Sequence, residues 1–238
     1  MNIEVSSRFA GPPAMGHGGY VAGLLAERTG GPVQVTLRRP IPLDVELEVV
    51  QLEAGCLELR HSGEVLVSSE PTTLEIDVPT APSLEEARAA EPASPAHAEP
   101  NGVHPTCFGC GALRAPGDAL RIFAGPLEVG GHAQVAGAWR PGVAFAEPDG
   151  SVAMRWVLAA LDCPGAFAFI TEGTRAGLLG RIAFEQLGPV RADADHVVTG
   201  WRIGVDGRKL FAGTALFDHD GALLAAARAT WFPMPAAP

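Results

Sequence analysis

The sequence predicts an α+β fold in which each half of the chain forms one apolar helix followed by antiparallel strands. Each half contains a helical segment and then four strand-like runs, over residues 18–76 in the first half and 151–232 in the second. A His-x-Gly turn also joins the last two runs in both halves, at His61 and at His219. Such a turn is compatible with a tight β-hairpin. The two halves are therefore interpreted as an internal duplication.

The first half is expected to open with a helix over residues 18–28. Its sequence is apolar nearly all round, which is typical of a helix enclosed by a sheet, and Thr29-Gly-Gly-Pro32 ends it. The residues from Pro40 to Asp44 predict a turn between the first two strands. The four strands are expected near 33–39, 45–52, 56–60 and 65–76.

The second half is expected to repeat this pattern with a helix over residues 151–161. Asp149 is interpreted as the N-cap of this helix, and Cys163-Pro164-Gly165 is expected to close it. An extra hairpin should precede the helix, with 120–124 paired to 133–139 across Gly130-Gly131. The four later strands are expected near 179–187, 196–205, 209–217 and 223–232.

The segment 78–105, which is rich in Pro, Ala and Glu, separates the two halves. It is interpreted as a crossover linker on the surface, with disorder as the alternative. Within it, Ser83 and Glu86 have the spacing of a capping box and predict a short helix. The expected organisation is a first unit at 1–77, the linker, and a second unit at 106–238.

The composition restricts the class of protein. The formal net charge of −10 argues against nucleic acid or an anionic membrane as the main partner. The N-terminus lacks a signal-peptide pattern, no stretch is long enough to span a membrane, and four cysteines in 238 residues do not form a disulfide scaffold. We therefore expect a soluble, cytoplasmic protein.

The most informative motif is the run Gly16-His17-Gly18-Gly19-Tyr20, which leads directly into the first helix. Glycines allow the backbone to come close to a ligand, and the start of a helix presents unpaired N–H groups and the positive end of its dipole. Such an arrangement can hold an oxyanion or polarise a carbonyl oxygen. A glycine-rich turn before a core helix, with His17 filling a hydrogen bond, is the alternative interpretation.

This run, followed by the segment Gln34-Val-Thr-Leu-Arg-Arg-Pro-Ile-Pro-Leu43, resembles the hotdog-fold acyl-CoA thioesterases. The second half is similar to a further hotdog unit, and Ala160-Leu-Asp-Cys-Pro-Gly165 resembles a segment of double-hotdog proteins. The resemblance implies two tandem hotdog units, each a central helix wrapped by a curved antiparallel sheet, with the active site between them. It further implies an acyl-CoA or acyl-carrier thioester as substrate, while exposed sheet edges could pair two chains into a homodimer.

A thioesterase of this kind needs an oxyanion hole and a carboxylate. The backbone N–H groups of Gly18, Gly19 and Tyr20 are the candidates for binding the thioester oxygen. Asp162 is the leading candidate for the catalytic carboxylate, because an acid in the last turn of an apolar helix opposes the helix dipole. Capping of nearby backbone N–H groups is its alternative role.

Two further residues are candidates for the catalytic set. Glu27 approaches the position of the family acid only with a shift of one residue, and His17 could orient substrate or water. Arginines that could meet CoA phosphates are Arg38, Arg39, Arg155, Arg181 and Arg208.

The segment from His104 to Gly111 contains the spacing His104-x-x-Cys107-x-x-Cys110. These three soft ligands could begin a zinc site, but no second pair of ligands follows, so the fourth would have to be Cys163 or a distant His. A compact glycine-rich turn that starts the second unit is the simpler interpretation. No metal and no cofactor are therefore predicted.

The predicted function is hydrolysis of a thioester by water that a carboxylate activates. Two alternatives remain open at this point. A binding protein could keep the acyl groove without catalysis, or the chain could be a hotdog dehydratase or hydratase. Release of free thiol from a panel of acyl-CoA substrates would separate the three.

Overall fold

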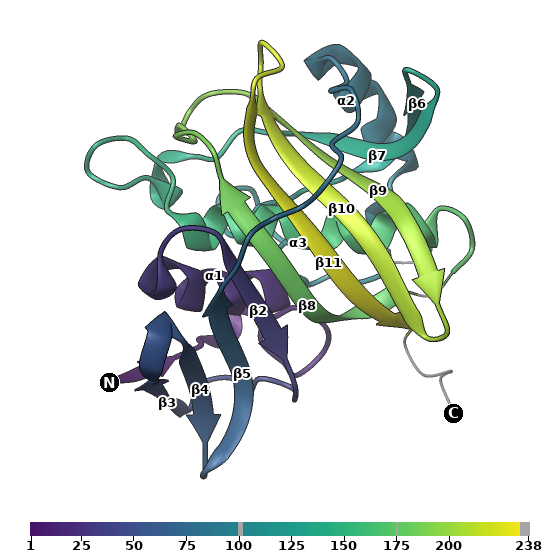
Figure 1. Ribbon diagram of the computed structural model, residues 1–238. Coiled ribbons are helices and arrows are strands. Elements are labelled where there is room, and N and C mark those ends of the chain that lie inside the picture. The colour runs from purple at the N-terminus through teal and green to yellow at the C-terminus, as the bar shows by residue number, and fades with distance from the viewer. Residues whose placement is uncertain (100–101, 175, 234–238) are drawn as a thin grey trace.

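The computed structural model describes residues 1–99, 102–174 and 176–233. Its strands form a single antiparallel sheet of 11 strands, and the two long helices lie together behind that sheet in the view of Figure 1. This arrangement confirms the predicted α+β class. A third, short helix lies at the end of the sheet where the last strand of the order is found (Figure 1).

The first half forms the elements that the sequence predicts, with one addition. The helix and the four strands lie within a few residues of their expected positions, and β1, which has only three residues, was not predicted. The elements are β1 (Asn2–Glu4), α1 (Gly18–Thr29), β2 (Val33–Leu37), β3 (Glu46–Gln51), β4 (Leu57–His61) and β5 (Glu64–Pro71).

The second half also follows the predicted order. Its elements are β6 (Gly125–Val129), β7 (His132–Trp139), α3 (Met154–Ile170), β8 (Ala176–Gln186), β9 (His196–Asp206), β10 (Lys209–Asp218) and β11 (Leu223–Pro233).

The prediction for the first strand of the extra hairpin was wrong. The strand that pairs with β7 is Gly125–Val129, not 120–124. The backbone N–H groups of Leu120 and Ile122 instead donate to the carbonyls of Phe108 and Gly109. A segment whose donors are already used in this way cannot extend the ladder.

Both halves of the sheet follow the same strand order. In the first half the order is β1-β3-β4-β5-β2, and in the second it is β7-β9-β10-β11-β8, with β6 added at the outer edge. The halves meet where β2 pairs with β8, and Val35 there lies opposite Ile182. Both of these side chains are fully buried. The two halves therefore share one continuous sheet and one core beneath its centre.

The expected end of the second helix was wrong. Helix α3 continues through Pro164 to Ile170, and its N-cap is Ala153. Asp149 accepts the Ser151 N–H in the preceding turn instead. A proline inside a helix removes one hydrogen bond and costs about 3 kcal/mol. The residues after Pro164 nevertheless include two buried phenylalanines, Phe167 and Phe169, and their burial offsets this cost.

The segment between the halves is partly helical. Ser83 and Glu86 form the predicted capping box at the start of α2 (Leu84–Ala90). Ala87 is fully buried in a small hydrophobic cluster that includes Trp201 of β9. The described part of this segment therefore covers the end of the sheet rather than hanging free.

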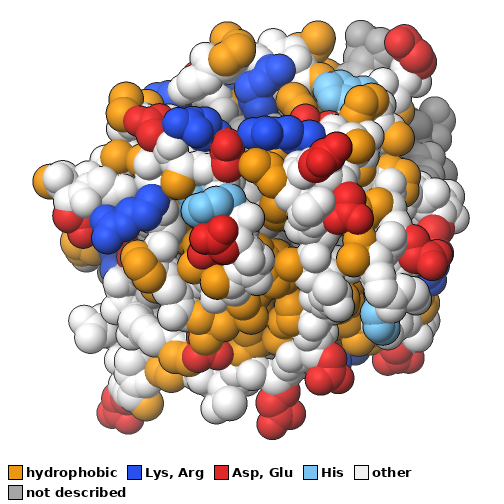
Figure 2. All heavy atoms as spheres, turned by 90° about the horizontal axis from the view of Figure 1, so that it is seen from above, with side chains coloured by type: hydrophobic (Ala, Val, Ile, Leu, Met, Phe, Trp, Pro, Cys, Tyr) orange, Lys and Arg blue, Asp and Glu red, His pale blue; other side chains and the backbone are white. Residues whose placement is uncertain are grey.

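Charged side chains of both signs are spread over the face in Figure 2, around a hollow where hydrophobic side chains gather. Among the helices that the structure describes, none combines the length and the apolar character needed to cross a membrane.

The close contact between α1 and α3 depends on two glycines. A Cβ atom at Gly19 would lie 2.6 Å from the Cβ of Asp162, and one at Gly23 would lie 2.3 Å from the Cα of Arg155. Both distances are shorter than van der Waals contact. The two backbones can therefore approach this closely only where the side chains are hydrogen atoms.

Replacement of Gly23 by Ala should destabilise the protein by about 1–3 kcal/mol, because the added methyl group overpacks the helix contact. This loss would oppose the gain of up to about 1 kcal/mol that Ala brings to a helix interior. Urea denaturation measures the change. Gly204→Ala is the control, since no atom lies within 4 Å of its added Cβ. Equal stability of both variants would contradict the close packing of α1 on α3.

Candidate active site

The start of α1 is capped by a buried histidine. His17 is the N-cap residue, and its Nδ1 accepts the backbone N–H of Tyr20 at 3.2 Å. Its own backbone N–H donates to the carbonyl of Phe9. His17 is therefore held at the beginning of the helix by its ring, as an ordinary N-cap side chain would be, and also by its backbone.

Asp162 reaches the same point from the middle of α3. Its Oδ2 accepts the Gly19 N–H at 2.6 Å and lies 3.3 Å from Nδ1 of His17. Its Oδ1 has no hydrogen-bond partner among the described residues, and the side chain is buried, with only 5% exposed. The structure thus brings together His17 and Asp162, two of the predicted site residues, from opposite halves of the chain.

Burial and neighbouring charges act on this pair in opposite directions. Burial lowers the pKa of His17. The charges of Asp162 and Cys107 and a hydrogen bond with Cys107 act in the opposite direction and outweigh burial, so the pKa of His17 is raised to about 9. Burial raises the pKa of Asp162, while the charge of His17 and the Gly19 N–H lower it. The net direction is upward for both groups.

Nδ1 of His17 cannot accept a hydrogen bond from the Tyr20 N–H and donate one to Asp162 at the same time. The neutral ring with its proton on Nε2 satisfies Tyr20, whereas the ring protonated on Nδ1 donates to Asp162. The raised pKa of His17 favours the second state near neutral pH. In that state the Tyr20 N–H loses its acceptor and becomes available to another one.

A cavity of about 370 Å³ opens beside this pair. His17, Gly18 and Asp162 line it, and most of its remaining wall is apolar, with Phe167 of α3 and Trp231 of β11 among the residues that form it. Three arginines whose side chains are exposed also belong to its lining, which places them at the rim: Arg38, Arg39 and Arg208. Arg155 and Arg181, the other two arginine candidates, do not line this cavity.

The predicted oxyanion donors differ in their surroundings. The N–H groups of Gly19 and Tyr20 point to Asp162 and His17, and neither residue lines the cavity. Gly18 does line it, and no partner for its N–H is found within the part of the chain that the structure describes. Gly18 is therefore the donor that a ligand in the cavity could use first.

Glu27 lies away from His17 and Asp162, at the other end of the helix pair. Its carboxylate accepts the backbone N–H of Arg155 at 2.9 Å and its guanidinium at 3.0 Å. Arg155 also contacts Glu147 at 2.9 Å. Glu27 therefore caps the start of α3 and compensates a charge, and it does not line the cavity.

The contacts at the two helix starts are related. Gly19 is the second residue of α1 and donates to Asp162 on α3, while Arg155 is the second residue of α3 and donates to Glu27 on α1. Each helix thus carries an acid that meets the start of the other helix. At the start of α1 a cavity lies beside the acid, whereas at the start of α3 the acid is paired with the Arg155 side chain.

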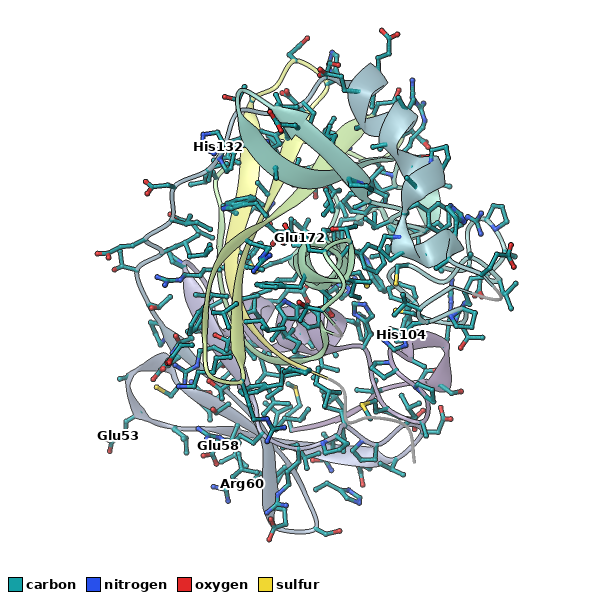
Figure 3. All side chains as sticks on the ribbon, turned by 90° about the vertical axis from the view of Figure 1, so that its right-hand side faces the viewer. Glu53, Glu58, Arg60, His104, His132 and Glu172 are labelled. Carbon is teal, nitrogen blue, oxygen red and sulfur yellow. The ribbon has the colours of Figure 1, made fainter. Side chains whose placement is uncertain are left out.

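Three cysteines, Cys107, Cys110 and Cys163, also line the cavity, and one of them contacts Nε2 of His17. The Sγ of Cys163 lies 3.7 Å from Nε2 of His17 and 3.9 Å from the Sγ of Cys107. Cys110 is buried beside them in the same cluster. Sequence reasoning considered these cysteines only around His104, which Figure 3 shows on the segment beside the helices. Their contact with His17 joins residues about 90 to 146 positions apart, and no local signal could reveal it.

No family model matches the chain, and no curated protein matches its sequence. Solved structures do match its backbone. The tesB protein of Mycobacterium avium subspecies paratuberculosis has a TM-score of 0.65 at 17% identity, and the match covers 98% of this chain and 92% of that one. A protein of unknown function with a hot dog fold, from Alicyclobacillus acidocaldarius, has a TM-score of 0.61 at 13% identity, covering 99% of this chain and 93% of that one.

The chain has a hotdog fold. A protein named as a thioesterase, from Novosphingobium aromaticivorans, agrees with this assignment at a TM-score of 0.60 and 14% identity, with coverage of 98% of this chain and 95% of that one. The hotdog resemblance that the His17-Gly18-Gly19 run suggested is therefore confirmed at the level of the fold.

Replacement of Glu27 by Ala should destabilise the hotdog fold by about 1–3 kcal/mol, because it leaves the partly buried start of α3 and the Arg155 guanidinium without their acceptor. Urea denaturation measures the loss. Glu64→Ala is the matched control, since Glu64 pairs with Arg39 where both side chains are more than half exposed. Such an exposed pair contributes about 0–1 kcal/mol. If both variants lost the same stability, the structural role of Glu27 would be wrong.

Proposed function

We propose that the chain is a cytoplasmic thioesterase made of two hotdog units in tandem, acting on an acyl-CoA or acyl-carrier thioester. The units are 1–77 and 106–238, and 78–105 is the linker between them. The repeated strand order on either side of the β2–β8 pair supports this division. The tesB and thioesterase names of the structural neighbours agree with the activity.

The observation that carries the proposal is the buried, unpartnered Oδ1 of Asp162 beside a cavity. A buried carboxylate oxygen without a partner is costly, so it is expected to serve a ligand. Asp162 would take a proton from a water molecule as the water oxygen bonds to the thioester carbonyl carbon. His17 holds Asp162 in position and compensates its charge.

The start of α1 would stabilise the negative charge that develops on the carbonyl oxygen. Gly18 lines the cavity at this point, so its N–H and the positive end of the helix dipole would stabilise this charge. Collapse of the tetrahedral intermediate breaks the carbon–sulfur bond, and the thiol leaves with the proton that Asp162 carried. The products are a carboxylic acid and a free thiol.

The cavity and its rim fit the two ends of such a substrate. The apolar wall formed by Phe167, Trp231 and their neighbours suits an acyl chain, and Arg38, Arg39 and Arg208 suit phosphate groups outside it. The position of these arginines supports a substrate with a phosphorylated carrier thiol, although the net charge of the whole protein is −10. A homodimer formed by pairing of sheet edges remains a prediction.

Two alternatives each have an observation in their favour. The occupied N–H groups of Gly19 and Tyr20 favour a binding protein without catalysis. The His17–Asp162 pair could instead act as an acid and a base in the addition of water to an unsaturated acyl thioester. A panel of acyl-CoAs separates the three, since only hydrolysis releases thiol and only hydration consumes the double bond.

Replacement of Asp162 by Asn should lower the rate of thiol release by about 100-fold or more, because the amide cannot take the proton from water. The melting temperature should stay nearly unchanged, since Asn keeps an oxygen for the Gly19 N–H. Thiol release and thermal unfolding are measured on the same preparation. Asp149→Asn, in an exposed turn, is the matched control and should keep full activity. Normal turnover by the Asp162 variant would remove it from the site.

Replacement of Arg208 by Ala should raise the KM for acyl-CoA about three- to tenfold and leave kcat unchanged, because it removes a contact that ground state and transition state share. The same acyl group on a short thiol without phosphates should show no change. Steady-state assays with both substrates measure this difference. The control is Arg191→Ala, an exposed arginine outside the cavity lining. A similar loss with both substrates would contradict phosphate binding by Arg208.

A further inference from the structure

The cysteine cluster beside His17 offers metal-ligand atoms that the proposed hydrolysis does not use. One ligand atom each from His17, Cys107 and Cys163 lie within 4.8 Å of one another, and all three residues are buried. The Cys110 thiol is also buried in the same hydrophobic cluster, but it lies outside this 4.8 Å group. Three ligand atoms therefore lie close together, and Cys110 is a buried candidate for the fourth.

Two of the distances in this cluster match the edges of a tetrahedral zinc site. Zinc bound to sulfur at about 2.3 Å and to nitrogen at about 2.0 Å separates two sulfurs by about 3.8 Å and a sulfur from a nitrogen by about 3.5 Å. The Cys107–Cys163 separation is 3.9 Å and the Cys163–His17 separation is 3.7 Å. Little movement would be needed to place an ion between these atoms.

The chain is built to hold the Cys107–Cys110 turn against His17. A Cβ at Gly109 would lie 2.6 Å from Nε2 of His17 and 2.8 Å from the Sγ of Cys163, so only glycine fits between the ligands. The Gly111 N–H closes the turn on the carbonyl of Cys107 at 2.8 Å. The Phe108 N–H fixes the turn to the carbonyl of Ala10, in the segment before α1.

We propose that His17, Cys107, Cys110 and Cys163 form a zinc site that joins the start of α1, the Cys107–Cys110 turn and the middle of α3. Four protein ligands would complete a tetrahedral shell and leave no open position, as in structural rather than catalytic zinc sites. The histidine is His17 and not His104, the one suggested by the sequence spacing. The ligands come from both halves of the chain and would hold them together.

Zinc on Nε2 would also define the proton on the other ring nitrogen. A histidine that binds metal through one nitrogen carries its proton on the other and donates it to a carboxylate or carbonyl in many proteins. Here Nδ1 lies 3.3 Å from Oδ2 of Asp162. The metal would thereby position His17 and Asp162, and the site could exist whether or not the chain is a thioesterase.

Metal content tests the proposal directly. Protein expressed without a His tag in zinc-supplemented medium should hold about one zinc per chain by elemental analysis. Cys110→Ser and His17→Ala should each lose most of it. Cys56→Ser and His104→Ala are the matched controls and should keep it, because Cys56 lies outside the cluster and His104 is not among the four ligands.

Cobalt(II) provides a second measurement on the unaltered chain. Substituted into the metal-free protein, it should show the sulfur-to-cobalt absorption of thiolate ligands, and most of this absorption should be lost in Cys110→Ser. Measured on the unaltered protein, this readout depends neither on activity nor on the folding of a variant. Substoichiometric zinc together with no cobalt absorption in the unaltered protein would overturn the proposal, as would retention of zinc by His17→Ala with loss by His104→Ala.

Discussion

The close approach of α1 to α3 is the constraint on which the rest of the structure depends. It brings the start of each helix against an acidic side chain of the other, and it brings both halves of the sheet to their junction at β2 and β8. Gly19 and Gly23 allow the approach, because any side chain at these positions would meet the backbone or Cβ of α3. The contact between His17 and Asp162 follows from this geometry and does not need a separate binding loop.

A buried acid–histidine pair is an expensive way to hold two helices together. Removing both groups from water costs several kcal/mol, and an apolar pair of similar size would pack at least as well. One oxygen of Asp162 lacks any partner in the described part of the chain, so the pair is not optimised for stability. Groups kept under such conditions beside a cavity are concentrated at functional sites.

Local patterns in the sequence predicted the secondary structure well, except where burial outweighed a local signal. The strands were found because each alternates or ends in a turn residue, and the Ser83–Glu86 cap was found from its spacing. Pro164 was interpreted as a helix end, which placed Asp162 in a last turn, whereas it lies in the middle of α3. The apolar residues from Gly165 to Phe169 are buried, and this burial keeps the chain helical beyond Pro164.

The site was predicted in part. His17 and Asp162 could each be named from their local sequence, but not their contact, which links positions 145 residues apart. The same limit applied to the cysteines, since the sequence could offer Cys163 or a distant histidine as a further ligand without choosing between them. Glu27 was named from its distance along the first helix, and only the three-dimensional position of Arg155 shows what it binds.

The pairing of Glu27 with Arg155 has a consequence for how such a protein can change over time. In an assembly of two identical chains, every substitution appears twice, so an arginine that pairs with the acid at one helix start would also do so at the twin position. Here the two helices are encoded separately within one chain. One helix start can therefore carry an ion pair while the other keeps a buried acid and a histidine beside a cavity.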